Sequence, residues 1–135
     1  MSDNACVVDA SAVLALLHAE PGDKHVRQVL LQGGVFMSTV NYAEIVGKFM
    51  ETSVSPMAFH EWFTQLGIRL VALDEETAFM AGELKPKTKA LGLSLGDRVC
   101  LALSKKLNLP ALTADVIWQQ LAPEYAITLI RHTSL

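Results

Sequence analysis

The chain has 135 residues, of which 51% are hydrophobic and 19% are charged, and this composition suits one domain with a sizeable core. Its 11 Lys and Arg against 14 Asp and Glu give a net charge of -3, so no general basic footprint indicates nucleic acid. The apolar runs stop well before the roughly 20 residues of a membrane helix, and Met1-Ser2-Asp3-Asn4 lacks a basic signal-peptide start. We therefore expect a single domain over residues 1–135, with no membrane segment, in the cytoplasm.

The first apolar run, residues 5–8, predicts a strand that is buried on both faces, because small and β-branched residues follow one another without polar alternation. The run ends on Asp9, and Ser11 follows as the pattern becomes helical over residues 12–17. Asp9 is thus expected at the carboxyl end of a strand, which is where ligands bind in open α/β sheets.

Helical and strand patterns alternate along the rest of the chain, and Gly, Pro, Ser and Asp mark the boundaries between them. This alternation predicts an α/β fold, a three-layer α/β/α sandwich around a short, mainly parallel sheet. The predicted elements are a helix over 24–32, a strand over 35–37, a helix from 39 through 49, a helix from 56 to 66, a strand over 68–73, a helix from 75 to 84, a helix over 99–107, a strand over 109–113 and a strand over 127–130.

Four acidic residues, Asp9, Glu44, Asp97 and Asp115, are bracketed by apolar neighbours, whereas the other acids lie in turns, helix starts or polar segments. In the predicted sheet, acids at the ends of the first and fourth strands converge on one crevice. Carboxylates brought together repel one another, and burying them is unfavourable unless a cation or hydrogen bonds compensate. Mg²⁺ or Mn²⁺, which prefer oxygen ligands, would resolve this repulsion.

Each acid also has a simpler interpretation when it is taken alone. Asp9, Asp97 and Asp115 stand where a helix begins and are suited to capping it. Glu44 has no capping role in the middle of its helix, although Lys48 stands four residues later as a partner for an exposed ion pair. The joint pattern is what favours a common site.

Four segments of the chain carry these acids in a distinctive order: Asp9-Ala10-Ser11, Asn41-Tyr42-Ala43-Glu44-Ile45, Leu93-Ser94-Leu95-Gly96-Asp97-Arg98 and Thr113-Ala114-Asp115-Val116-Ile117-Trp118. In this order and spacing, over nearly the whole chain, the sequence resembles the PIN domain and in particular the VapC-like toxins of toxin-antitoxin pairs. No segment is specific by itself, but the combination in a chain of this length is.

The resemblance implies a metal-dependent endoribonuclease that uses Mg²⁺ or Mn²⁺. It places the metal-binding quartet on Asp9, Glu44, Asp97 and Asp115, with Ser11 and Thr113 as catalytic support. For Asp115 it leaves two alternatives, direct contact with the metal or contact through a water. It also implies an RNA substrate, a cognate antitoxin that holds the enzyme inactive, and a homodimer.

The hypothesis for the mechanism is that the metal orients and acidifies a water for attack on a phosphodiester, so that no side-chain nucleophile is needed. Contacts to the phosphates of the substrate are expected from cations near the site. The candidates are Arg98, which could instead pair with one of the four acids, and Lys85, Lys87 and Lys89, a run that is also typical of a solvated helix end.

Two other functions fit parts of the pattern. A haloacid-dehalogenase-like phosphohydrolase also places an Asp nucleophile at the end of its first strand, but it needs a second Asp where Ser11 stands. A catalytically silent PIN-like module that only binds a partner has no physical need to gather four carboxylates.

Overall fold

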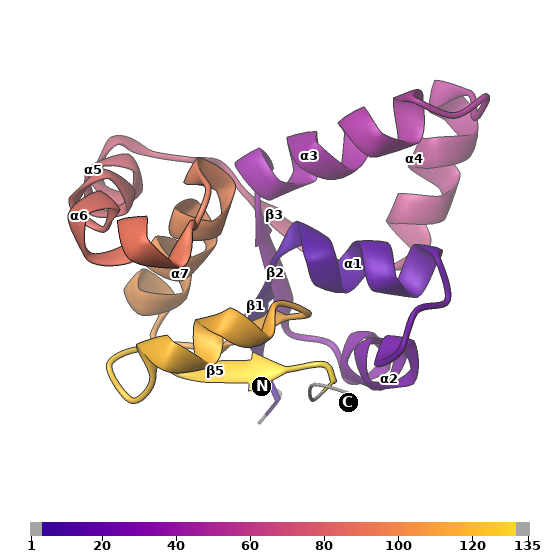
Figure 1. The fold of residues 1–135 in the computed structure, drawn as a ribbon. Helices are drawn as coiled ribbons and strands as arrows, with labels where there is room; N and C mark the ends of the chain where they lie inside the picture. The colour runs from indigo at the N-terminus through magenta and orange to yellow at the C-terminus, as the bar shows by residue number, and fades with distance from the viewer. Residues whose placement is uncertain (1–3, 132–135) are drawn as a thin grey trace.

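The structure of the chain, a computed structural model, describes residues 4–131 and is built on one sheet of five short strands (Figure 1). The order of the strands in the sheet is β3-β2-β1-β4-β5, and every neighbouring pair is parallel. The predicted α/β class with a parallel sheet is confirmed. The strands are β1 (Cys6–Val8), β2 (Val35–Ser38), β3 (Arg69–Val71), β4 (Ala111–Thr113) and β5 (Ile127–Leu129).

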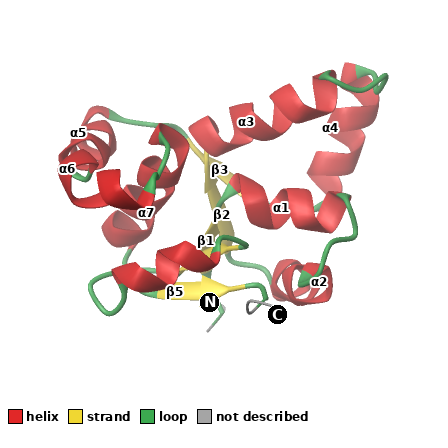
Figure 2. Ribbon diagram, viewed as in Figure 1, coloured by secondary structure: helices red, strands yellow, loops and turns green. Residues whose placement is uncertain are grey.

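Helices cover both faces of the sheet and make the predicted three layers (Figures 1 and 2). In the view of Figure 1, the first four helices lie to the right of the sheet and the next three to its left. The α-helices are α1 (Ala10–Leu17), α2 (Asp23–Gln32), α3 (Thr39–Met50), α4 (Pro56–Gln65), α5 (Glu75–Glu83), α6 (Lys85–Thr88) and α7 (Leu95–Leu107), and the 3-10 helices are η1 (Lys89–Leu91) and η2 (Val116–Leu121).

Alternate residues of the central strand β1 feed two separate cores. Cys6 and Val8 pack with α1 to α4, whereas Val7 packs with α7 and with Trp118 of η2. All three residues of β1 are buried, as the unbroken apolar run predicts for a strand covered on both faces. Cys100 of α7 lies in the second core and is, like Cys6, a free buried cysteine.

Several boundaries differ from the predicted ones, and α7 differs most. It begins at Leu95 and not at residue 99, because Ser94 accepts a hydrogen bond from the Asp97 amide while Asp97 accepts one from the Ser94 amide. This reciprocal capping box draws the preceding loop into the first helical turn. Pro86, in turn, lies in the first turn of the separate helix α6, so the helix before it ends at Glu83 as expected.

The strand order places a topological switch point between β1 and β4. From β1 the chain proceeds outward through β2 and β3 and then returns through α5 to α7 to form β4 on the other side. Loops that follow β1 and β4 therefore leave the same edge of the sheet in opposite directions and open a crevice between them. Asp9 follows β1 directly and Thr113 ends β4, so both lie at this crevice.

Within residues 4–131, none of the helices combines the length and the apolar composition needed to cross a bilayer.

We predict that shortening a helix side chain that is buried against the sheet destabilises the protein more than shortening an exposed one. Leu101→Ala removes a side chain of α7 that is 0% exposed and should lower the free energy of unfolding by about 2–5 kcal/mol. Leu31→Ala is the matched control, since Leu31 on α2 is 82% exposed, and it should change that free energy by less than about 0.5 kcal/mol. Urea denaturation measures both, and equal losses would contradict this fold.

Candidate active site

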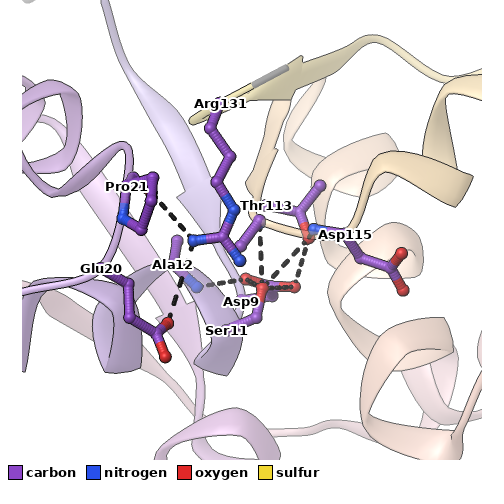
Figure 3. A network of polar contacts seen from close by, with 9 residues as sticks. Asp9, Ser11, Ala12, Glu20, Pro21, Thr113, Asp115 and Arg131 are labelled. Carbon is purple, nitrogen blue, oxygen red and sulfur yellow. Dashed lines mark hydrogen bonds and ion pairs between the residues drawn. The ribbon is translucent and has the colours of Figure 1, made fainter. Parts of the chain in front are cut away.

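Asp9 is the buried centre of a polar network at the switch point (Figure 3). The Thr113 hydroxyl donates to its Oδ2 at 2.6 Å, and the Ala12 amide donates to its Oδ1 at 2.9 Å. The Ser11 hydroxyl also donates to the carboxylate, at 2.8 and 2.9 Å from its two oxygens. Asp9 does cap α1, as its simpler interpretation predicts, but a cap alone needs neither burial nor the two hydroxyls.

The network fixes the relative position of the ends of β1 and β4. Besides donating to Asp9, Ser11 Oγ accepts a hydrogen bond from the Ala114 amide at 3.0 Å, and Thr113 Oγ1 accepts one from the Asp115 amide at 3.1 Å. The two hydroxyl oxygens lie 3.3 Å apart. Ser11 in the first turn of α1 and Thr113 at the end of β4 thus support Asp9 from segments that become neighbours only in the folded sheet.

Burial raises the pKa of Asp9 to about 6, even though the hydrogen bonds from Thr113, Ala12 and Ser11 all act to lower it. The negative charge of Asp97 raises the pKa further. A carboxylate removed from water favours its neutral form, and its own hydrogen bonds compensate only in part. Asp9 is therefore a site of uncompensated negative charge whenever it is ionised.

Asp97 is half-buried at the start of α7, where its Oδ2 accepts the Ser94 amide at 2.9 Å. Its helix-start interpretation is correct, and its charge nevertheless acts on Asp9. The next residue, Arg98, is buried, and its Nη1 donates to the Ala81 carbonyl at 3.0 Å. Arg98 therefore joins α7 to α5 and pairs with none of the four acids, which does not fit its expected role as a phosphate contact.

Glu44 lies in the middle of α3 with an exposed side chain. Its Oε1 accepts a hydrogen bond from Asn41 Nδ2 at 3.0 Å, and Asn41 Nδ2 also donates to the Gly96 carbonyl at 3.1 Å. Among the described residues no ion pair joins Glu44 to Lys48, so the exposed-pair alternative for Glu44 does not hold. The Glu44 carboxylate instead lies against the first turn of α7.

Three of the four acids converge on the same region of the fold. Burial raises the pKa of the Cys100 thiol on α7, and the charges of Asp9, Asp97 and Glu44 each raise it further. Asp9 comes from the end of β1, Glu44 from α3 and Asp97 from α7, so elements far apart in the sequence bring these carboxylates together.

Asp115 differs from the other three acids. It is exposed, and its Oδ1 accepts the Ile117 amide at 3.1 Å, so it caps η2. Its carboxylate points away from that of Asp9 in Figure 3, although its backbone is tied to Thr113. The cap interpretation describes this conformation of Asp115.

The lysine run lies on α6 and at the start of η1, with all three side chains exposed. Lys87 pairs with Glu124 at 3.5 Å across a surface where both side chains are mostly in water. No hydrogen bond or ion pair between described residues links Lys85, Lys87 or Lys89 to the four acids.

The donor chemistry of the site suits a hard divalent cation. Within residues 4–131, no Lys, Arg or His forms an ion pair with Asp9, Glu44, Asp97 or Asp115, so no protein cation offsets their charge. In the same range, no group of three or more acidic, His or Cys side chains is arranged as a ready-made metal cage. Mg²⁺ does not require such a cage, because it keeps several waters and is held by a few carboxylates together with substrate phosphate.

Two residues that contact Glu44 at the site, Asn41 and Gly96, are not among the predicted site residues. The signal for Asn41 was its place three residues before Glu44, which puts both on one face of a helix. The capping box, which decides where Asp97 stands, had a signal in Ser94 three residues before it. Gly96 offers no such signal, because its role depends on a contact with a residue 52 positions away, Glu44 against Gly96.

Comparisons with known proteins agree with this geometry. The PIN domain family matches residues 6–123. No curated protein matches the chain by sequence.

Three solved structures show the same fold at low sequence identity. A toxin-antitoxin complex from Klebsiella pneumoniae is similar at 15% identity over 96% of this chain and 100% of that chain, with a TM-score of 0.70. FitAcB from Neisseria gonorrhoeae is similar at 19% identity over 95% and 99%, with a TM-score of 0.71. VapBC-1 from nontypeable Haemophilus influenzae is similar at 17% identity over 92% and 96%, with a TM-score of 0.71.

The raised pKa of Asp9 predicts a pH-dependent instability that Asp9→Asn should remove. Folding raises this pKa from 3.8 to about 6, so the folded state holds the proton more tightly and the wild type loses stability as the pH rises through that range. In EDTA, the free energy of unfolding of Asp9→Asn should rise above that of the wild type as the pH increases from about 4 to about 6. At pH 7 the difference should be on the order of 1–3 kcal/mol. Urea denaturation at several pH values measures this difference; a difference that does not change with pH would contradict the assignment.

Proposed function

The chain belongs to the PIN domain family, and from this premise we propose that it is a metal-dependent endoribonuclease, the toxin of a toxin-antitoxin pair. The observation that carries the proposal is the convergence of Asp9, Asp97 and Glu44 without a protein cation to offset them. Converging carboxylates oppose folding through their mutual repulsion, so their presence is explained by a ligand that needs them.

The ligand we propose is Mg²⁺ or Mn²⁺, held by Asp9, Asp97 and Glu44, with Asp115 acting through a water. When bound, such a cation lowers the pKa of water and offsets negative charge on a phosphoryl group, which are the two requirements of phosphodiester hydrolysis. The exposed, outward position of Asp115 is consistent with an indirect role.

The roles of the protein groups follow from their contacts. Ser11 and Thr113 hold the Asp9 carboxylate in one orientation. They donate hydrogen bonds to its oxygens, and these stabilise the ionised form in its buried position. The Ala12 amide adds a third donor from the first turn of α1. We propose that this set keeps Asp9 rigid, which a ligand to a small cation requires.

The phosphohydrolase alternative is disfavoured by the same contacts. Its mechanism needs Asp9 as a nucleophile. It also needs an acid where Ser11 stands, and the Ser11 hydroxyl is engaged with Asp9 and Ala114. The family match supports a nuclease instead.

The proposed partners are an RNA substrate, a cognate antitoxin and a second copy of the chain. The similar structure from Klebsiella pneumoniae is described as a toxin-antitoxin complex, which supports the antitoxin. Large apolar side chains at the surface, including Leu31, Met57 and Phe79, provide area for protein contacts. For RNA we propose Lys85 and Lys89 as phosphate contacts, with Lys87 shared with Glu124. The proposed compartment is the cytoplasm, where the free cysteines remain reduced.

The proposal predicts that cleavage of RNA requires a divalent cation. Purified protein freed of its antitoxin should cut a mixed single-stranded and structured RNA when Mg²⁺ or Mn²⁺ is added, because the carboxylates alone cannot activate water. EDTA should abolish cleavage, and gel electrophoresis of end-labelled RNA measures it. Cleavage that persists in EDTA would exclude the metal mechanism, and turnover of a small phosphate monoester without RNA cleavage would favour the phosphohydrolase.

The proposal also predicts that removing one carboxylate charge inactivates the enzyme without unfolding it. Asp97→Asn should lower the rate of RNA cleavage by at least about 100-fold, more than the 10- to 100-fold loss typical of a group that only supports a metal ligand. Asp23→Asn on α2 is the matched control and should cleave as the wild type does, since Asp23 lies in the first turn of a different helix. A folded Asp97→Asn variant with full activity would show a silent partner-binding module or a different site.

A further inference from the structure

We propose that Asn41 and Gly96 are positioning residues that together form a seat for the Glu44 carboxylate at the acidic site. The seat consists of the Asn41 amide nitrogen and the open face of Gly96. The inference rests on the proposed function, because it assigns the seat the task of presenting Glu44 to a divalent cation. Its structural half, the immobilisation of Glu44, stands on the contacts alone.

Asn41 links the two helices that form the site. It is 1% exposed, and its Nδ2 donates to Glu44 Oε1 at 3.0 Å within α3 and to the Gly96 carbonyl at 3.1 Å across to α7. Both amide protons are therefore used, one on the acid and one on the helix that carries Asp97. A buried side chain with two partners is rigid, so it can hold an exposed partner in place.

Within residues 4–131, the oxygen of the Asn41 amide is unpaired, so the part of this side chain that the structure uses is its donor nitrogen. Asn41 Oδ1 is buried and has no hydrogen-bond partner among the described residues, which is unfavourable for a polar atom away from water. Exchanging the oxygen and nitrogen would set the oxygen against Glu44 Oε1 and the Gly96 carbonyl, two acceptors, so the partners fix the orientation. The residue is suited to its donors, and such departures from good packing are expected at functional sites.

Gly96 provides the space in which the Glu44 carboxylate lies. A Cβ added to Gly96 would be 2.5 Å from Oε2, 2.6 Å from Oε1 and 2.7 Å from Cδ of Glu44. Gly96 lies in the first turn of α7 and its φ is not positive, so its conformation is open to any residue. The three heavy atoms nearest to such a Cβ all belong to Glu44, so the absence of a side chain at Gly96 makes room for the Glu44 carboxylate.

Glu44 needs such a seat because, within residues 4–131, its side chain has the hydrogen bond from Asn41 and no ion pair. Its side chain is exposed, and fixing a freely rotating Glu side chain opposes binding through lost rotamer entropy. Asp9, by comparison, is held by burial and three donors. The seat supplies to Glu44 the restraint that the network at the switch point supplies to Asp9.

The experiment compares Mn²⁺ affinity and RNA cleavage in Gly96→Ala and Asn41→Leu. In Gly96→Ala the methyl meets only the end of a flexible side chain, so the protein should fold while the carboxylate is displaced. In Asn41→Leu the shape is retained and both donors are lost. Each should weaken Mn²⁺ binding in calorimetry by roughly 10-fold, the lower end of the loss seen for groups that orient metal ligands.

Two controls separate positioning from a general structural role. Gly47→Ala adds the same methyl to α3 where nothing lies within 4 Å, and it should leave Mn²⁺ affinity unchanged. In a Glu44→Gln background, Gly96→Ala and Asn41→Leu should cause no further loss, because residues that act through one group are not additive.

Each outcome decides the proposal. Wild-type Mn²⁺ affinity in either folded variant, or full additivity with Glu44→Gln, would overturn the seat while the nuclease stands. Loss of cooperative unfolding in both variants, with Glu44→Gln intact, would show that Asn41 and Gly96 are structural residues. If the wild type itself neither binds Mn²⁺ nor cleaves RNA, the proposed function fails, and the seat fails with it.

Discussion

The structure depends on holding one ionisable carboxylate, Asp9, in a place from which water is excluded. Burial favours its neutral form, and the two hydroxyls and one amide that donate to it offset this only in part. One hydroxyl comes from the first turn of α1, just after β1, and the other from the end of the adjacent parallel strand β4, so the network forms only when the sheet has its observed order. These contacts make the switch point rigid, and the burial that they offset only in part makes a positive charge favourable there.

The other acids are arranged around this centre by helix starts. Asp97 stands in the first turn of α7 because Ser94 and Asp97 cap that helix reciprocally. Glu44 reaches the same turn from α3 through Asn41 and over Gly96. Capping and site formation are thus compatible roles for one carboxylate, since a cap uses one oxygen and leaves another free. Arg98, in contrast, is directed into the contact between α5 and α7, so the cation nearest in sequence does not neutralise the acids.

Membership of the PIN domain family explains the fold. The low sequence identity to the similar structures means that individual side-chain contacts cannot be transferred from them. The chain is a PIN domain, and the similar structures share 15% to 19% identity with it, so they establish the fold while its contacts have to be read from its own residues. The hydroxyl pair on Asp9 and the seat of Glu44 are two such contacts. Both contacts restrain a carboxylate. The buried Asp9 is held by two hydroxyls, and the exposed Glu44 is held by the Asn41 amide and the space above Gly96.

The sequence by itself determined the α/β class, the elements and the identity of the acids, because hydrophobic periodicity and capping residues act over a few neighbouring positions. It located Asp9 at a strand end and indicated Ser and Asp residues at element boundaries, and in the structure Ser38, Ser55 and Asp74 do cap their helices. Only the tertiary structure decided which acids meet. Thr113 reaches Asp9 from the adjacent strand, Gly96 makes room for Glu44, and Asp115 turns outward. These outcomes depend on strand order and on side-chain contacts between distant segments, which no local pattern in the chain encodes.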